Sequence, residues 1–185
     1  MKVICFGDSN TWGYDPRDFF GRPYDTIWPE LLETKTGLTI INWGENGREI
    51  PAGTISLPQD TDLLIVMLGT NDLLQGREPE EISKRMDRFL QSLPIARNSI
   101  LLIAPPHMRR GTWVTDSRLT ELSAQMTECF SRLASQQGIF FAYSNNWNIP
   151  IAYDGVHFTE EGHKIFAEEI THYLTMELGI CCKTE

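Results

Sequence analysis

The sequence predicts an α/β fold in which a parallel five-stranded β-sheet lies between two layers of helices. Short apolar runs alternate along the chain with segments of helical periodicity, the order that βαβ units require. The runs are almost continuously apolar, as is typical of strands covered on both faces. No repeat or low-complexity linker divides the 185 residues, so we expect residues 1–185 to form one domain. The expected architecture is a three-layer α/β/α sandwich.

Five apolar runs are the expected strands. They are residues 2–6, 38–41, 62–68, 99–104 and 139–143. Gly7 and Gly69 stop the first and third of these runs. Right-handed crossovers between such strands favour a doubly wound sheet, and ligands bind such sheets at the carboxyl ends of the strands. We therefore look for functional residues directly after the strands.

The first two expected helices follow the first and third strands. One covers residues 27–35, with Pro29 in its first turn and Gly37 after its end. The other follows Pro79 and carries its apolar residues at helical spacing: Ile82, Met86, Phe89, Leu90 and Leu93. This spacing predicts a helix with one face on the core.

Two longer helices are expected in the second half of the chain. One runs from Thr115 and closes at Gly138. The last begins at Thr159, whose side chain can cap it, with Glu160 and Glu161 in its positive first turn. Both carry apolar residues on one face, as helices packed on a sheet require.

Acidic residues outnumber basic ones, with 25 Asp and Glu against 16 Lys and Arg and a formal charge of −9. Most of such a surface repels phosphate groups, so nucleic acids and anionic membranes are poor partners. No apolar stretch approaches the length of about 18 residues that a membrane span needs. The first apolar run is also shorter than the core of a signal peptide, and we expect a cytoplasmic protein.

The four cysteines do not indicate a disulfide framework. Cys5 lies in an apolar run and Cys129 on a helical apolar stripe, positions that are typical of core thiols. Cys181 and Cys182 are adjacent, which gives neither the spacing of a zinc site nor that of a redox motif. We therefore expect the chain to fold without disulfide bonds.

Ser9 follows the first strand directly, after a glycine that permits a tight turn. Asp154 stands three residues before His157, in the loop ahead of the last helix. A carboxylate can hold one ring nitrogen of a histidine, which leaves the other nitrogen free to take a proton. Taken alone, the serine motif is also an ordinary turn, and the pair could be a metal half-site or a loop hydrogen bond.

Two more loops supply candidate hydrogen-bond donors. Asn71 follows the third strand, and Asn42 begins the segment N-W-G-E-N-G-R after the second strand. An Asn amide and a glycine N–H that point to one place can stabilise the oxygen charge that develops during acyl transfer. Asn is also a common turn former, so neither donor is decisive alone. A nucleophile, two donors and an acid–base pair lie in four loops after the first, second, third and fifth strands, and together they favour an acyl-transfer site.

With these four motifs the sequence resembles the SGNH hydrolases, also called GDSL esterases/lipases. The similar segments, in the family's order, are residues 7–9, 42–47, 69–72 and 154–157. Asn10 stands where the family's name has leucine, a position without a required catalytic role. The string C-F-G-D-S-N-T-W-G-Y resembles in particular the bacterial arylesterase/acyltransferase branch. The resemblance implies the flavodoxin-like SGNH hydrolase fold.

The resemblance also implies roles for individual residues. Ser9 is the implied nucleophile, His157 the general base and later acid, and Asp154 the residue that orients it. The side-chain N–H of Asn71 and the backbone N–H of Ser9 are implied donors to the oxyanion.

The third implied oxyanion donor is a backbone N–H in the second motif. Spacing favours Gly47 over Gly44, because the donor glycine is expected five residues after Asn42. The choice between these two glycines stays open at this point.

The implied reaction is hydrolysis, or transfer, of short-chain acyl groups from small carboxylic esters through an acyl-Ser9 intermediate, without cofactor or metal. A carbohydrate O-acetyl esterase, a thioesterase or a lysophospholipase could use the same site. A metal-assisted hydrolase would use Asp8, Asp154 and His157 as ligands but would leave Ser9 and Asn71 without a role. A flavodoxin-like binding module would need a phosphate loop, and neither G-x-G-x-x-G nor a P-loop is present. The sequence leaves the oligomeric state open, a homo-oligomer included.

Further residues are weaker candidates for the substrate pocket. Trp12 is implied to lie beside the acyl site, and His107 at the end of the fourth strand could reach the rim. His163 and His172 fall on the last helix, where we expect exposed or capping side chains. The loop 104–115, which contains two arginines and a tryptophan, is the stretch that most resembles a lid.

Overall fold

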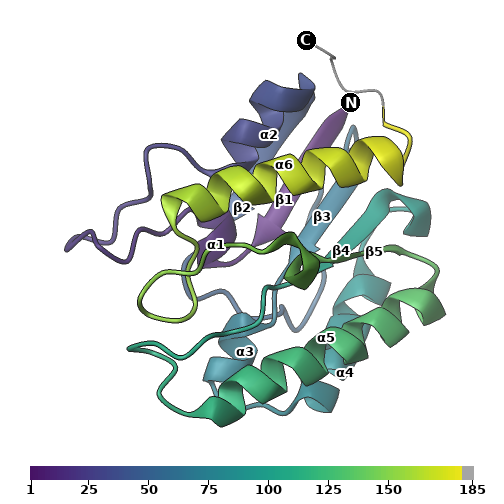
Figure 1. Ribbon diagram of the computed structural model, residues 1–185. Helices are drawn as coiled ribbons and strands as arrows, with labels where there is room; N and C mark the ends of the chain where they lie inside the picture. The colour runs from purple at the N-terminus through teal and green to yellow at the C-terminus, as the bar shows by residue number, and fades with distance from the viewer. Residues whose placement is uncertain (181–185) are drawn as a thin grey trace.

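Five parallel strands form one sheet in the computed structural model, which describes residues 1–180 (Figure 1). The strands are β1 (Lys2–Gly7), β2 (Thr39–Gly44), β3 (Leu63–Met67), β4 (Ile100–Ala104) and β5 (Phe140–Tyr143). Their order across the sheet is β2-β1-β3-β4-β5. The chain therefore winds from β1 to one edge and then back past β1 to the other, which places the switch point at the carboxyl end of β1. The expected parallel sheet is confirmed.

Helices cover both faces of the sheet, which confirms the expected sandwich. The long helices are α2 (Trp28–Thr36), α4 (Pro79–Ser92), α5 (Ser117–Gln137) and α6 (Glu160–Met176). α2 and α6 pack on one face, and α4 and α5 on the other (Figure 1). Val3 and Cys5 of β1 belong to the core under α2 and α6, whereas Ile4 and Phe6 belong to the core under α4 and α5. This is the alternation that a pleated strand imposes.

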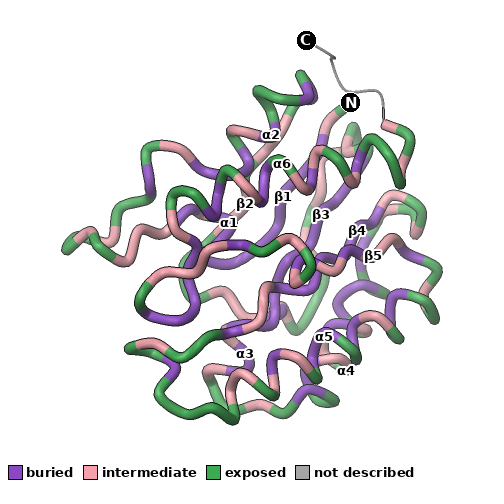
Figure 2. Tube along the Cα trace, in the orientation of Figure 1, coloured by how far each residue is buried: buried purple, intermediate pink, exposed green. Residues whose placement is uncertain are grey.

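The central strands β1, β3 and β4 are buried over almost their whole length, whereas the edge strands β2 and β5 are partly exposed (Figure 2). A strand that is covered on both faces has no solvent side, so its sequence is apolar throughout rather than alternating. The continuous run L-L-I-V-M of β3 is the clearest case.

Short elements and one strand end differ from expectation. The short helices are α1 (Ser9–Trp12), α3 (Thr70–Leu74) and the 3-10 turns Arg97–Ser99 and Ser144–Trp147. A single turn contains too few residues for helical periodicity, so these segments had the pattern of loops. β2 ends at Gly44 rather than Ile41, because residues 42–44 pair in register with residues 5–7 of β1.

The expected caps and terminal glycines are confirmed, but α5 begins at Ser117 rather than Thr115, because Asp116 caps it by accepting the backbone N–H of Arg118 at 2.9 Å. Gly37 and Gly138 follow α2 and α5 in the left-handed conformation, with φ of 68° and 65°. Thr159 caps α6, and its hydroxyl oxygen accepts the backbone N–H of Gly162 at 3.0 Å. Pro29 lies in the first turn of α2, where its missing N–H has no intrahelical partner to lose.

His163 lies on the buried face of α6, which corrects the expected exposed or capping position. Its side chain is fully buried, and Nδ1 accepts the backbone N–H of Trp28 at 3.3 Å. Burial lowers the pKa of His163 to about 3, so the ring is neutral at pH 7. His163 shares its helix face with Phe166, three residues later, and is a core residue. His172 is exposed, as expected.

The cysteines that the structure describes are both buried free thiols, as expected for Cys5 and Cys129. Cys181 and Cys182 lie outside the described residues. Over residues 1–180 we find no helix with the length and apolar character that a membrane crossing requires.

Candidate active site

Ser9 is the first residue of α1, directly beyond the carboxyl end of β1. Asp8 caps this helix, since its Oδ1 accepts the backbone N–H of Asn10 at 3.0 Å. No larger residue fits at Gly7, because a Cβ there would lie 2.0 Å from the hydroxyl oxygen of Thr11. The chain therefore turns from strand to helix within two residues and places the Ser9 hydroxyl at the edge of the sheet.

Ser9, His157 and Asp154 form one chain of hydrogen bonds at this edge. Ser9 Oγ lies 2.9 Å from His157 Nε2, and His157 Nδ1 lies 2.6 Å from Asp154 Oδ2. The exposed fractions are 7%, 2% and 0% for Ser9, His157 and Asp154. With the carboxylate holding Nδ1, the Nε2 atom faces the hydroxyl and can accept its proton. The fold thus brings together two motifs that lie 148 positions apart.

The carboxylate of Asp154 is held in its ionised form by its own loop. Its Oδ1 accepts the backbone N–H groups of Val156 at 2.9 Å and His157 at 3.0 Å. Burial alone would raise the pKa of Asp154, but the hydrogen bonds from His157 and Val156 outweigh it and lower that pKa. An ionised carboxylate here stabilises positive charge on the His157 ring once Nε2 has taken a proton.

The loop between β4 and α5, residues 105–116, packs on the loop that carries Asp154 and His157. Backbone N–H groups of Arg109 and Trp113 donate to the carbonyls of Gly155 at 2.9 Å and Asp154 at 3.0 Å. Gly155 has a φ of 87°, and a Cβ there would lie 2.0 Å from the Arg109 carbonyl oxygen. Glycine is therefore required for this close approach. The segment that resembles a lid in the sequence is a backbone support of the histidine loop.

Two aromatic rings contact the ring of His157. The Tyr14 ring centroid lies 4.6 Å from that of His157, and the Trp113 centroid 5.0 Å, with Trp113 at an interplanar angle of 84°. The two rings also touch each other, with centroids 6.3 Å apart. The sequence did not identify these two residues as neighbours of His157.

Asn10 is a residue of the candidate site whose contacts the sequence did not predict. Its Nδ2 donates to the carbonyl of Val156 at 3.2 Å, and its Oδ1 accepts the backbone N–H of Phe158 at 2.9 Å. Its own carbonyl accepts the indole N–H of Trp28 at 3.0 Å. The carboxamide therefore joins the serine helix to the residues on both sides of His157. The only sequence signal was the departure from leucine at this position.

The expected oxyanion donors lie on neighbouring segments after β3 and β2. Asn71 belongs to α3, and its Nδ2 donates one N–H to the carbonyl of Arg48 at 3.0 Å. Gly47 is exposed in a left-handed turn with φ of 74° and open space around its Cα. The N–H of Gly44 already donates to Asn42 Oδ1 at 2.8 Å. This arrangement favours Gly47 over Gly44 as the backbone donor.

Arg48 ties the donor segment to the end of β1, just before the serine helix. Its guanidinium donates to the Gly7 carbonyl at 3.0 Å and to the Trp43 carbonyl, and it lies 4.3 Å above the ring of Phe6. Because the Arg48 carbonyl also accepts from Asn71, the carboxyl ends of β1, β2 and β3 are joined through one residue.

A partly buried ion cluster around the fully buried Asp72 supports the same segment. Asp72 Oδ2 accepts the backbone N–H of Ile50 at 3.0 Å, and Asp72 Oδ1 lies 3.1 Å from Nε of Arg85. Arg85 also donates to the Ile50 carbonyl at 2.7 Å, and Glu49 pairs with Arg77 at 2.7 Å. Burial raises the pKa of Asp72, a cost that the nearby guanidinium groups offset. The cluster fixes α3 and the chain after Gly47 relative to each other.

Asp8 is the second buried carboxylate beside the serine. Burial raises the pKa of Asp8 to about 6, against the opposing effect of the Asn10 N–H and of His157 and Arg48 nearby. Asp8, Asp154 and His157 are not arranged as ligands around one point, and residues 1–180 contain no group of three His, Cys, Asp or Glu that could hold a metal ion.

Trp12 and His107 have no hydrogen bond or ring contact with Ser9 or His157. Trp12 ends α1, and its backbone lies so close to Gly44 that a Cβ there would be 2.1 Å from Trp12 N. His107 Nε2 lies 3.3 Å from Thr127 Oγ1, on the side of α5. His107 lines a hollow of about 260 Å³ with Ser144 and Asn145, and partial burial lowers its pKa. Both residues stay predictions as pocket residues.

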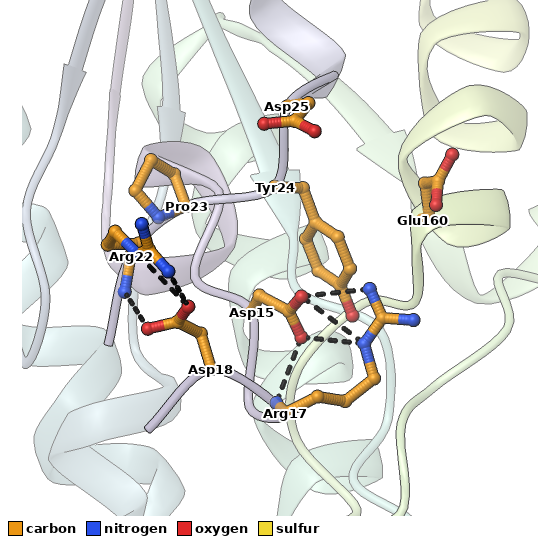
Figure 3. A pocket seen from close by; sticks show the side chains of 8 residues that line it. All are labelled: Asp15, Arg17, Asp18, Arg22, Pro23, Tyr24, Asp25 and Glu160. Carbon is orange, nitrogen blue, oxygen red and sulfur yellow. Dashed lines mark hydrogen bonds and ion pairs between the residues drawn. The ribbon is translucent and has the colours of Figure 1, made fainter. Parts of the chain in front are cut away.

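A larger hollow of about 420 Å³ lies in the loop after α1 and reaches Glu160 at the start of α6 (Figure 3). Its arginines are already paired, Arg17 with Asp15 at 2.8 Å and Arg22 with Asp18 at 2.9 Å. The lining residues include none of the Ser9–His157–Asp154 chain. The hollow is therefore separate from the candidate active site.

The sequence matches the profile of a known protein family and two named relatives. The sequence profile of the GDSL-like Lipase/Acylhydrolase family matches residues 5–165, which include Ser9, Asn71, Asp154 and His157. An arylesterase of Vibrio mimicus is 27% identical over 119 residues, which cover 57% of this chain and 56% of that protein. A GDSL lipase of Mycobacterium tuberculosis is 27% identical in an alignment that covers 95% of this chain and 82% of that protein.

Solved structures share the fold. A carbohydrate acetylesterase family member from Sinorhizobium meliloti matches with a TM-score of 0.78 at 22% identity, over 96% of this chain and 99% of that one. The aryl esterase of M. smegmatis matches with a TM-score of 0.75 at 21% identity, over 94% of this chain and 97% of that one. The α/β/α arrangement is therefore the same in all three chains.

Proposed function

The chain belongs to the GDSL-like lipase/acylhydrolase family, and on that premise we propose that it hydrolyses carboxylic esters of short acyl chains through an acyl-Ser9 intermediate. The observation that carries the proposal is the chain of hydrogen bonds from Ser9 Oγ through His157 to Asp154. A serine hydroxyl is a weak nucleophile unless a base removes its proton, and this chain supplies the base and its orienting carboxylate.

In the first half of the reaction, Ser9 Oγ attacks the ester carbonyl carbon while His157 Nε2 takes the hydroxyl proton. The oxyanion that forms accepts hydrogen bonds from the free side-chain N–H of Asn71 and from the backbone N–H groups of Gly47 and Ser9. Each such donor is worth about 10²–10³ in turnover in enzymes of this kind. The tetrahedral intermediate collapses when His157 passes its proton to the leaving alcohol, and the acyl group stays on Ser9.

In the second half, His157 takes a proton from water, which attacks the acyl-Ser9 ester; the intermediate then collapses as His157 returns the proton to Ser9 Oγ, and the acid is released. An alcohol in place of water would give acyl transfer by the same steps. Neither half needs a metal or a cofactor.

The position of the 105–116 loop supports the proposal that the acyl chains are short. This loop is bonded directly to the backbone of the Asp154–His157 loop, so it is held there and is not free to close over a long acyl chain. The family name and the arylesterase and carbohydrate acetylesterase relatives support small esters, with acetylated sugars as the second candidate.

The test is a series of p-nitrophenyl esters with acyl chains from two to twelve carbons, measured with the wild type and with Ser9→Ala. We expect the highest kcat/KM at the short end and no turnover by the variant. A chelator should leave the wild-type rate unchanged. Turnover by a folded Ser9→Ala variant, or a chelator-sensitive rate, would contradict the proposed mechanism and favour metal-assisted hydrolysis.

A further inference from the structure

The rings of Tyr14 and Trp113 differ from the other aromatic side chains of the loops because both contact the ring of His157. Their backbones are also bonded to the candidate catalytic residues themselves. The Tyr14 N–H donates to the Ser9 carbonyl at 3.0 Å, and the Trp113 N–H donates to the Asp154 carbonyl at 3.0 Å. The backbone of each residue is therefore held to Ser9 or Asp154, and the ring of each lies against the ring of His157.

Trp113 leaves much of its ring uncovered. Its side chain is 52% exposed, although it touches His157, which is only 2% exposed. Tyr14 is partly buried, and its ring lies against those of both the histidine and the tryptophan. The two rings thus form an apolar wall that begins at His157 and opens to solvent. An exposed tryptophan held in a fixed place is typical of a binding surface, because it offers a large contact area at low entropic cost.

The reaction chemistry determines which part of an ester meets this wall. His157 Nε2 must deliver its proton to the leaving oxygen, so that oxygen has to come within about 3 Å of Nε2. The first carbons of the alcohol then lie beside the His157 ring, where Tyr14 and Trp113 are. The acyl carbon is bonded to Ser9 Oγ, and its oxygen points to donors from the different segments after β2 and β3.

We propose that Tyr14 and Trp113 form the subsite for the alcohol part of the ester, and that this subsite takes uncharged alcohols with a flat carbon face. The inference rests on the proposed function. Aromatic faces attract flat rings, either another aromatic ring or the C–H face of a sugar. The nearby carboxylates Asp8 and Asp154 and the net charge of −9 disfavour anionic alcohols and thiols.

The same subsite would receive the attacking molecule in the second half of the reaction. The forward and reverse steps of acyl transfer pass through the same arrangement of atoms, so an acceptor alcohol binds where the leaving alcohol was. A flat alcohol is therefore both the preferred leaving group and the preferred acceptor in competition with water.

The experiment compares acetate esters that differ only in the alcohol. Benzyl acetate has a flat ring, n-heptyl acetate has the same number of alcohol carbons without one, and methyl acetate has almost no alcohol to bind. A methyl xyloside monoacetate provides the sugar ring. The proton released by hydrolysis is measured in a pH-stat for the wild type, Trp113→Ala, Trp113→Phe and the control Phe19→Ala, which removes a ring that is 94% exposed.

We expect Trp113→Ala to lower kcat/KM about 3- to 10-fold for the ester with the matching ring, and to change methyl acetate by less than about twofold. Trp113→Phe should restore most of the loss, and Phe19→Ala should have no effect. A selective loss on benzyl acetate identifies an aryl alcohol, and a selective loss on the xyloside identifies a sugar. In a series of methyl esters, the dependence on acyl chain length should be the same in Trp113→Ala and wild type.

An equal loss on all four esters, n-heptyl and methyl acetate included, would overturn the subsite, as would a changed dependence on acyl chain length. Either result requires an active wild-type esterase and so leaves the proposed function intact. A folded wild type that hydrolyses none of the esters would overturn both proposals.

Discussion

Asn10 Oδ1 accepts the backbone N–H of Phe158 at 2.9 Å, across 148 positions of the sequence. The other end of the same carboxamide donates to the Val156 carbonyl at 3.2 Å. These two bonds hold the residues before and after His157, so they set the position of its ring relative to Ser9, the neighbour of Asn10. Leucine, which the family name has at this position, could make neither bond.

Replacement of Asn10 should therefore impair catalysis more than binding. We expect Asn10→Ala and Asn10→Leu to lower kcat by about 10- to 100-fold at nearly unchanged KM, because a small displacement of a catalytic group has effects of that size. The rate at which a fluorophosphonate labels Ser9 should fall in parallel. Thr36→Val is the matched control: the Thr36 hydroxyl also makes one donor and one acceptor bond in a buried place, with Leu32 and Leu38. A similar fall in kcat for this control would show that the Asn10 variants lose activity through lost stability and not through a displaced His157 ring.

Asp8 should make stability depend on pH. Its folded-state pKa is raised by burial from 3.8 to about 6, so the folded protein binds this proton more tightly than the unfolded chain. Asp8 therefore contributes about 3 kcal/mol to the free energy of unfolding at low pH. This contribution is fully present below pH 4 and is lost as the pH rises through 6. Asparagine caps a helix as well as aspartate and stays neutral. The free energy of unfolding of Asp8→Asn should therefore exceed that of the wild type by more at pH 8 than at pH 4. A difference that does not change with pH would show that Asp8 has an ordinary pKa.

The ion cluster around Asp72 should affect both stability and turnover. Arg85→Met leaves the fully buried Asp72 carboxylate without its nearest cation, which costs about 3 kcal/mol in comparable cases. It also releases Ile50, three residues after Gly47, so kcat should fall. The double variant Asp72→Asn, Arg85→Met should recover much of the stability. Arg88→Met, an exposed position on the same helix, is the control. If Arg85→Met unfolds at the same denaturant concentration as Arg88→Met and the wild type, the cluster does not stabilise the fold.

Gly155 should not tolerate a side chain. Gly155 and Gly138 both have positive φ, but a Cβ on Gly155 would lie 2.0 Å from the Arg109 carbonyl oxygen, whereas Gly138 is in open space. Gly138→Ala carries only the strain of the left-handed conformation, about 1–2 kcal/mol, and should keep the wild-type kcat. Gly155→Ala has to separate the 105–116 loop from the Asp154–His157 loop, and we expect at least a tenfold lower kcat. Equal activity of the two variants would contradict the support that we assign to this contact.

Much of the fold could be predicted because the burial of the strands determines their composition. The β3 segment is covered on both faces and is apolar throughout, and glycines at positive φ end α2 and α5. His163 was misplaced because a histidine is usually exposed, although its spacing to Phe166 puts it on the buried face. The family assignment could be predicted too, because its four motifs are each continuous in the sequence.

The contacts between the motifs could not be predicted, because they join residues far apart in the chain. Nothing in the sequence around Trp113 indicates that its ring lies on His157, since that contact depends on a backbone bond to Asp154. The role of Asn10 was hidden for the same reason: its partners follow it by 146 and 148 positions. Arg48 and Asp72 likewise act through backbone groups that carry no sequence signal.

The assignment of Ser9 as the nucleophile is tested most directly by locating the covalent adduct of a fluorophosphonate, a reagent that reacts with activated serines. We predict one adduct per chain, located by peptide mass spectrometry on Ser9. Ser9→Ala should take up no adduct, and His157→Ala should react far more slowly. An adduct on another residue, or an unmodified wild type that still hydrolyses p-nitrophenyl acetate, would contradict the assignment of Ser9 as the nucleophile.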